Sequence, residues 1–181
     1  MTRWLAALPL VALAALAILF AGYALHRNPH VEPHTLVGKP MPDLTLPDLS
    51  GGQPARLKDA LQAGPLLVNF FASWCGPCEI EHPVLMAMHG RHVRMVGIAY
   101  KDAPPNTQGL LTRMGDPYAQ TLVDRDGRAG IEFGITGVPE TYLIGRDGKV
   151  LAKHTGPLSE ADAQALSDQA LDAQAPGVTG R

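Results

Sequence analysis

The sequence predicts an α/β sandwich, in which helices flank a central mixed sheet, preceded by one transmembrane helix. A short apolar run, Leu66–Phe71, reads as a buried strand and leads directly into Cys-Gly-Pro-Cys at positions 75–78. A second apolar run, Val93–Tyr100, follows at the spacing of a parallel strand–helix–strand unit. An almost unbroken apolar segment over residues 4–25 precedes the rest of the chain.

The length, charge balance and cysteine count of the chain limit the functions that it can have. A length of 181 residues suits one domain with a short appendage. The 17 acidic residues balance 15 Lys and Arg without a basic stripe, so we expect no nucleic-acid partner. Two cysteines are too few for a framework of structural disulfides, and a single pair close in the sequence is typical of a reactive or metal-binding site.

The amino-terminal apolar segment is predicted to anchor the protein in a membrane. Its 22 residues, Trp4–Leu25, reach about 33 Å as a helix, which is enough to cross a bilayer. A cleaved secretory signal that starts at Arg3 is the alternative, but residues 21–24 form a poor cleavage site. We therefore expect residues 1–3 in the cytoplasm, an uncleaved anchor over 4–25, and the domain outside.

A linker is predicted over residues 26–37, before a domain over 38–173 and a flexible tail over 174–181. Its histidines, four residues apart, would share a helical face and suggest a metal site, but Pro29 and Pro33 disfavour that helix. We therefore interpret them as solvated linker residues.

The domain is expected to open with an irregular strand or hairpin over 38–59, turning at Ser50-Gly51-Gly52, with a helical turn at Leu57–Leu61. A helix from Cys75 to about Gly90 follows the central strand, and Pro83 is expected to kink it. Beyond the second strand, short elements are expected at Thr107–Met114 (helix), Thr121–Val123 (strand) and Ala129–Phe133 (helical turn).

The last elements carry clear turn and cap signals. Arg146-Asp147-Gly148 between Tyr142–Ile144 and Val150–Lys153 predicts a hairpin. Ser159, with Asp162 three residues later, predicts the start of the final helix.

The cysteine pair is the candidate catalytic site. Pro77 fits the first turn of a helix, which places Cys75 at the helix N-terminus, where the dipole favours a thiolate. We predict that Cys75 is the nucleophile and that Cys78, expected to be less exposed, resolves the mixed disulfide.

Metal binding is the rival interpretation from a different class. Cys75, Cys78 and His82 share one helical face and suit Cu(I) or Zn, which would make the chain a non-enzymatic copper-binding module. Pro83 beside His82 and the lack of an evident fourth ligand argue against it, so we expect no metal. Covalent haem is excluded because Glu79, not His, follows Cys78.

Trp74-Cys75-Gly76-Pro77-Cys78 after a buried strand resembles the thioredoxin superfamily. The segments 100–102 (Tyr-Lys-Asp), 115–119 (Gly-Asp-Pro-Tyr-Ala) and 137–144, which contains Val-Pro-Glu-Thr, are similar to the membrane-tethered DsbE/CcmG proteins of cytochrome c maturation. The likeness spans roughly Gly38 to Leu171 and implies a thioredoxin-like fold with the amino-terminal extension of DsbE-like and TlpA-like proteins.

The resemblance also implies roles for particular residues. Val138-Pro139 is expected to be cis and to lie against the cysteines, with its backbone free to pair with an extended substrate. Asn69 stands where thioredoxins bury an Asp, and Glu81 and Glu140 match acidic residues that DsbE-like proteins carry near the motif. The residues expected to bind substrate or to modulate the cysteines are Trp74, Gly76, Pro77, Glu81, Val138, Pro139 and Glu140.

Ordinary structural roles remain alternatives for some of these side chains. Glu81 is either a partly buried acid with a raised pKa or a solvated glutamate. Trp74 either shields the thiolate and touches substrate or simply packs. Glu79 is assigned to solvent.

The function implied is that of a single-pass bacterial inner-membrane protein whose periplasmic domain is a thiol:disulfide oxidoreductase without a cofactor. Its expected substrate is apocytochrome c or a CcmH-like thiol chaperone, and its expected electron donor is a membrane protein of the DsbD/CcdA type. We expect a monomer. A TlpA-like reductase for copper-site assembly is the alternative within the superfamily.

Overall fold

The computed structural model describes residues 12–16, 18, 19, 22, 36–89 and 94–173. The predicted cytoplasmic end (1–3) and tail (174–181) lie outside these residues, as do most of the predicted anchor (4–25) and linker (26–37). Within the part of the chain that the structure describes, no helix is long and apolar enough to cross a membrane. The chain divides into two units, Met1–Pro33 and His34–Arg181, and the fold that follows belongs to the second.

The sheet is organised around β3 (Leu66–Phe71), all six residues of which are buried. The other strands of this five-stranded sheet are β4 (Arg94–Tyr100), β5 (Gln120–Asp124), β6 (Glu140–Ile144) and β7 (Val150–Thr155). Their order is β5-β4-β3-β6-β7. The β3–β4 and β4–β5 pairs are parallel, whereas β3–β6 and β6–β7 are antiparallel, which confirms the predicted mixed sheet.

The helices are α2 (Gly76–Met88), α3 (Pro104–Met114), α4 (Arg128–Phe133) and α5 (Glu160–Asp172), with a 3-10 helix η1 (Leu57–Ala63). The prediction for α3 was wrong at its start, because the helix begins at Pro104 and not at Thr107. Prolines fit the first turn of a helix, where the missing amide would have no intrahelical partner. A Pro-Pro pair that reads as a break in the sequence is therefore the start of the helix.

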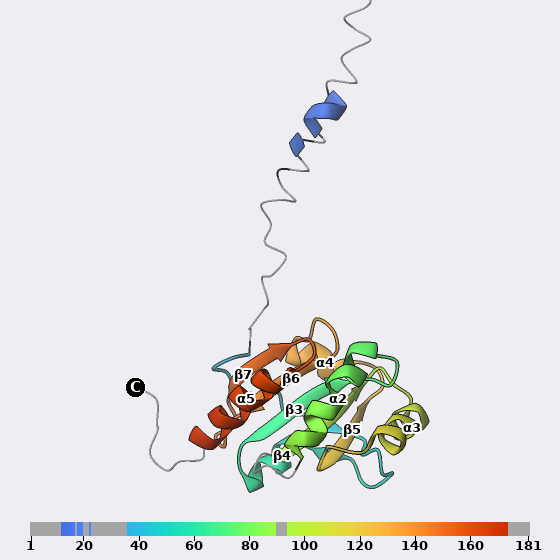
Figure 1. The fold of residues 1–181 in the computed structure, drawn as a ribbon, viewed down its shortest axis with the longest axis vertical. Coiled ribbons are helices and arrows are strands. Elements are labelled where there is room, and N and C mark those ends of the chain that lie inside the picture. Colours follow the sequence, from blue (N-terminus) through green and yellow to red (C-terminus); the bar gives the residue numbers. More distant parts are fainter. Residues whose placement is uncertain (1–11, 17, 20–21, 23–35, 90–93, 174–181) are drawn as a thin grey trace, which may run out of the picture. The chain divides into compact units, whose positions relative to one another are not determined.

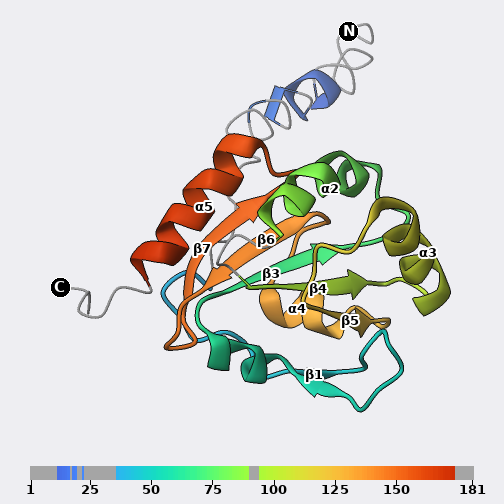
Figure 2. The same cartoon turned by 60° about the horizontal axis from the view of Figure 1, so that its bottom comes forward.

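Alternate residues of β3 point to opposite faces of the sheet and so belong to two hydrophobic cores. Leu67 and Phe71 pack in a core with residues of α2, α3 and α5. Leu66, Val68 and Phe70 pack in the other core, against the amino-terminal segment, η1 and α4. Figures 1 and 2 show α2 and α5 side by side across one face of the sheet, with α4 on the other. Asn69 shares its face with Leu67 and Phe71 and therefore points toward α2.

The amino-terminal extension forms the predicted hairpin, with β1 (Thr45–Leu46) paired to β2 (Ala55–Arg56). Val37, the last residue of the predicted linker, forms a bridge with Val150 of β7. Asp48 forms a bridge with Leu122 of β5, so the extension also contacts the opposite edge of the sheet.

The carboxy-terminal signals in the sequence are confirmed. The chain turns between β6 and β7 at the expected residues, with Gly148 at a φ of 80°, a left-handed conformation that glycine adopts without strain. Ser159 caps α5 in a full capping box with Asp162. This cap holds the start of α5, and with it Leu158, beside α2.

Candidate active site

The two cysteines lie where the central strand passes into α2. Cys75 is the N-cap residue, and its sulfur accepts a hydrogen bond from the amide of Cys78 at 3.2 Å. The pair forms a disulfide, with Gly76 and Pro77 exposed between the two sulfurs. The prediction that Cys78 is the less exposed of the two was wrong for this form, since each cysteine is 4% exposed. Closing a four-residue disulfide turn buries both sulfurs together.

The segment around Pro139 lies against this disulfide, as the resemblance implies. The Val138–Pro139 peptide bond is cis, and the carbonyl oxygen of Val138 lies 3.4 Å from the sulfur of Cys75. The Pro139 carbonyl accepts a hydrogen bond from the amide of Gly156 at 2.9 Å, which ties the segment to the end of β7. A chain that reaches Cys75 must therefore pass beside this loop.

Trp74 presents its ring to solvent beside the cysteines. The side chain is 59% exposed, and its indole nitrogen donates to the carbonyl of Lys101 at 3.2 Å. Lys101 has a φ of 47°, a left-handed conformation that is uncommon for a residue other than glycine. The exposed ring favours the substrate-contact alternative over simple packing.

Asp102, which was not predicted as a site residue, holds the segment that contains Ser73 and Trp74. Its carboxylate is buried and accepts hydrogen bonds from the amide and hydroxyl of Ser73 at 2.7 and 2.9 Å. It also accepts from the amide of Ala103 at 2.8 Å and from the hydroxyl of Thr107 at 2.9 Å. An acidic residue two positions after the end of a buried strand was the signal in the sequence that could have identified it.

Glu81 is fully buried on α2, three residues after Cys78, so the solvated alternative was wrong. One carboxyl oxygen accepts from the amide of Leu158 at 2.9 Å, and the other accepts from the side-chain amide of Asn69 at 3.0 Å. Burial raises the pKa of this carboxyl to about 7, and the two hydrogen bonds act in the opposite direction. Glu81 can therefore take or release a proton near neutral pH.

Asn69 joins Glu81 to a tyrosine that sequence reasoning missed. Its amide nitrogen also donates to the hydroxyl of Thr141 at 3.0 Å, and its oxygen accepts from the hydroxyl of Tyr118 at 2.7 Å. Burial and the nearby carboxyl of Glu81 hold the pKa of the Tyr118 hydroxyl well above its usual value. Tyr118 lies in the Gly-Asp-Pro-Tyr segment that carried part of the resemblance.

Glu140 is a second buried carboxylate, next to the cis proline, and it has a cationic partner. One oxygen accepts from the amide and hydroxyl of Thr136 at 2.9 and 2.7 Å. The other accepts from the hydroxyl of Tyr142 at 2.9 Å and lies 3.0 Å from the ammonium of Lys153, which is 2% exposed. The sequence identified Glu140 but not Lys153, because no local pattern links positions on neighbouring strands.

His82, the third candidate ligand of the copper-binding alternative, already has a hydrogen-bond partner. The imidazole of His82 is buried and donates to the carbonyl of Gly115 at 3.0 Å. Among residues 36–89 and 94–173, no group of three His, Cys, Asp or Glu side chains is placed to hold a metal ion. Glu79 is half-exposed and pairs with Arg113 at 2.8 Å, in line with its assignment to solvent.

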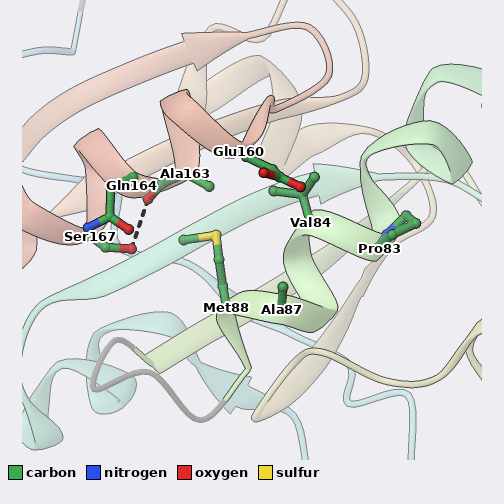
Figure 3. A pocket seen from close by; sticks show the side chains of 8 residues that line it. All are labelled: Pro83, Val84, Ala87, Met88, Glu160, Ala163, Gln164 and Ser167. Carbon is green, nitrogen blue, oxygen red and sulfur yellow. Dashed lines mark hydrogen bonds between the residues drawn. The ribbon is translucent and has the colours of Figure 1, made fainter.

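A groove of about 350 Å³ between α2 and α5 lies apart from the cysteines. Figure 3 shows the eight side chains that line it: Pro83, Val84, Ala87, Met88, Glu160, Ala163, Gln164 and Ser167. It contains neither cysteine and none of the buried acids, so we do not assign it to the reactive site.

Comparison with known proteins connects this geometry to a family. The Redoxin family model matches residues 36–168. The chain is 40% identical over 158 residues to the thiol:disulfide interchange protein DsbE of Allochromatium vinosum, covering 87% of this chain and 84% of the relative. It is 37% identical over 162 residues to HelX, a thiol:disulfide interchange protein of Rhodobacter capsulatus, covering 88% and 91%.

A solved structure extends the comparison to the fold. The crystal structure of a thiol:disulfide interchange protein of the thioredoxin family from Chlorobium tepidum matches with a TM-score of 0.60 and 30% identity. The match covers 73% of this chain and 95% of that one. The thioredoxin-like fold and the family resemblance inferred from the motifs are therefore confirmed.

Proposed function

Because the chain belongs to the Redoxin family and, within it, to the DsbE-type thiol:disulfide interchange proteins, we propose that it is a membrane-anchored periplasmic reductase of cytochrome c maturation. The protein is a thiol:disulfide oxidoreductase. The single observation that carries the proposal is the Cys75–Cys78 disulfide at the N-terminus of α2, with the Val138 carbonyl 3.4 Å from the Cys75 sulfur.

The reaction uses the two cysteines in sequence. In the reduced protein, the N-terminus of α2 stabilises the thiolate of Cys75, which attacks a substrate disulfide and releases one substrate thiolate. The mixed disulfide is then attacked by the thiolate of Cys78, which forms the intramolecular disulfide and releases the second substrate thiolate. Two electrons pass to the substrate, and the two released thiolates take up two protons.

We assign to Glu81 the role of general base: it accepts the proton that the Cys78 thiol must lose before it attacks the mixed disulfide. It lies on the buried face of α2, one helical step beyond Cys78, and its raised pKa suits proton exchange near neutral pH. In the return half-reaction, in which an electron donor reduces the disulfide, the same carboxyl returns the proton.

Trp74 and the Val138–Pro139 loop are assigned to substrate contact, with Glu140 holding that loop in place. Trp74 is exposed and precedes Cys75 in the chain, and the Val138 carbonyl lies 3.4 Å from the Cys75 sulfur. An extended peptide substrate would pair with the backbone at Val138 and contact the exposed ring of Trp74. Gly76 and Pro77 are exposed between the two cysteines in the chain, so a substrate can contact them.

The substrate we propose is the oxidised haem-attachment segment of apocytochrome c, or the thiol chaperone that carries it. The names of the relatives support thiol:disulfide interchange, and the Val-Pro-Glu-Thr and Tyr-Lys-Asp segments support the cytochrome branch of the family. Disulfides persist in the periplasm, so this reductant needs a donor, which we propose is a membrane protein of the DsbD/CcdA type. The apolar segment 4–25 supports anchoring in the inner membrane.

Trapping the mixed disulfide tests this function. The reduced Cys78→Ser variant is incubated with a synthetic peptide that carries an oxidised Cys-x-x-Cys-His motif. We expect a Cys75–peptide adduct by mass spectrometry, because the resolving thiol is absent. The Cys75→Ser variant should give no such adduct. A peptide of the same composition with the residues around its disulfide scrambled should react more slowly, and equal rates would contradict the proposed substrate.

A further inference from the structure

The buried side chains of Tyr118, Asn69 and Glu81 form one continuous hydrogen-bonded chain. Tyr118 donates to the oxygen of Asn69 at 2.7 Å, and the nitrogen of Asn69 donates to Glu81 at 3.0 Å. The same nitrogen donates to Thr141 at 3.0 Å. These groups come from α2, β3, β6 and the segment before β5, so only the folded chain assembles them.

The surroundings of Glu81 contain little charge that could fix its protonation state. No cationic side chain among the described residues forms an ion pair with Glu81, whereas Glu140 is paired with Lys153. From the segment just before α5, the backbone amide of Leu158 donates to Glu81 at 2.9 Å. On α2, the other buried titratable residues near Glu81 in the chain are Cys78 and His82. On the segment before β5, Tyr118 interacts electrostatically with Glu81 and with Asp116.

An amide is suited to such a carboxyl because it offers both a donor and an acceptor. With Glu81 ionised, the Asn69 nitrogen donates to the carboxylate, which is the arrangement in the structure. With Glu81 protonated, the acid proton can be donated to the Asn69 oxygen once the amide turns over. The hydroxyls of Tyr118 and Thr141 can each donate or accept, so they satisfy the amide in both orientations.

We propose that Asn69 and Tyr118 are positioning residues that let buried Glu81 exchange a proton with the cysteine pair without leaving a buried polar group unpaired. The inference deepens the proposed function and rests on it, because that function assigns the Cys78 proton to Glu81. An aspartate at position 69 would accept hydrogen bonds but could not donate one to Glu81 when ionised.

Tyr118 determines which of the two orientations of the Asn69 side-chain amide is favoured. Its hydroxyl donates to the Asn69 oxygen and so favours the orientation that stabilises ionised Glu81. Without this donor, the buried oxygen is satisfied by a protonated Glu81 instead, because an unpaired buried acceptor is costly. The Tyr118→Phe variant should therefore titrate Glu81 at a pH about one unit higher than the wild type does.

The titration of Glu81 is measured directly in the oxidised full chain by carbon-13 NMR of labelled glutamate carboxyls, with the Glu81 signal assigned by Glu81→Gln. The matched control is Tyr142→Phe, which deletes a buried hydroxyl that donates to the other buried carboxyl, Glu140. We expect an upward shift in Tyr118→Phe and an unchanged Glu81 midpoint in Tyr142→Phe. An unchanged midpoint in Tyr118→Phe, or equal shifts in both variants, overturns the inference.

A second variant keeps the test decisive where Tyr118→Phe does not fold. Asn69→Asp places a carboxyl within about 3 Å of Glu81, so the two groups should share a proton and titrate in two separated steps. A single unshifted step for Glu81 in this folded variant contradicts the proposed contact.

Thiol reactivity separates this inference from the function on which it rests. In the reduced protein, the pH profile of alkylation at Cys78 should move with the Glu81 midpoint in Tyr118→Phe. A shifted Glu81 midpoint with an unmoved cysteine profile upholds the role of Tyr118 toward Glu81 but refutes proton exchange between Glu81 and the cysteines. An unmoved Glu81 midpoint refutes the inference while leaving the disulfide chemistry of Cys75 intact.

Discussion

The buried Glu81 carboxyl should make the stability of this protein depend on pH in a defined direction. Its pKa rises from an ordinary value of 4.5 to about 7 in the folded chain. Between these values the folded protein holds a proton that the unfolded chain has released, so the free energy of unfolding falls as pH rises. The contribution is fully present below about pH 4.5 and is lost above about pH 7.

The size of this effect follows from the shift. A difference of roughly 2.5 pKa units at about 1.4 kcal/mol each corresponds to a total loss of roughly 3.5 kcal/mol, of which about 3 kcal/mol falls between about pH 4.5 and about pH 8. Glu81→Gln removes the titration, and the other ionisable groups stay in place. The free energy of unfolding of the wild type minus that of Glu81→Gln should therefore decrease by about 3 kcal/mol between about pH 4.5 and about pH 8.

Urea unfolding of the oxidised chain at a series of pH values, followed by circular dichroism, measures this difference. Glu79→Gln is the matched control, because Glu79 lies two residues away on the same helix but is half-exposed and paired with Arg113. Its difference from the wild type should stay nearly flat with pH. A wild-type minus Glu81→Gln difference that is flat, or that increases with pH, would refute the assignment of a buried, proton-binding Glu81.

Two further perturbations test the supports of the site by urea unfolding. Lys153→Met leaves the Glu140 carboxylate buried without its cation, and we expect a loss of about 3 kcal/mol, against less than about 1 kcal/mol for the exposed Lys149→Met. Equal losses would contradict the buried pair. Asp102→Asn replaces one of the oxygens that accept from four donors with an amide group that can only donate. We therefore expect the free energy of unfolding to fall by about 2 kcal/mol and Trp74 to become more mobile by fluorescence anisotropy. A fully stable variant with an unchanged Trp74 signal would show that the loop does not depend on this carboxylate.

Local sequence patterns were sufficient wherever neighbours in the chain determine the structure. The run Leu66–Phe71 is apolar at nearly every position and so predicts a strand buried on both faces. Pro77 at the first turn placed the start of α2 at the cysteines, and Ser159 with Asp162 placed the start of α5. The same local reasoning was wrong at Pro104, where a proline pair begins a helix that was expected to start later.

The reactive chemistry can be read from neighbouring residues: a cysteine pair three residues apart at the start of a helix, after a buried strand. The side chains that surround this pair come together only through packing of distant segments. Asn69, Tyr118 and Glu81 are far apart in the chain and meet only because β3 carries Asn69 on the face that α2 covers. Glu140 and Lys153 meet because neighbouring strands pair in one register. Burial by distant segments sets the pKa of Glu81, and burial is a property of the packed chain that no local pattern contains.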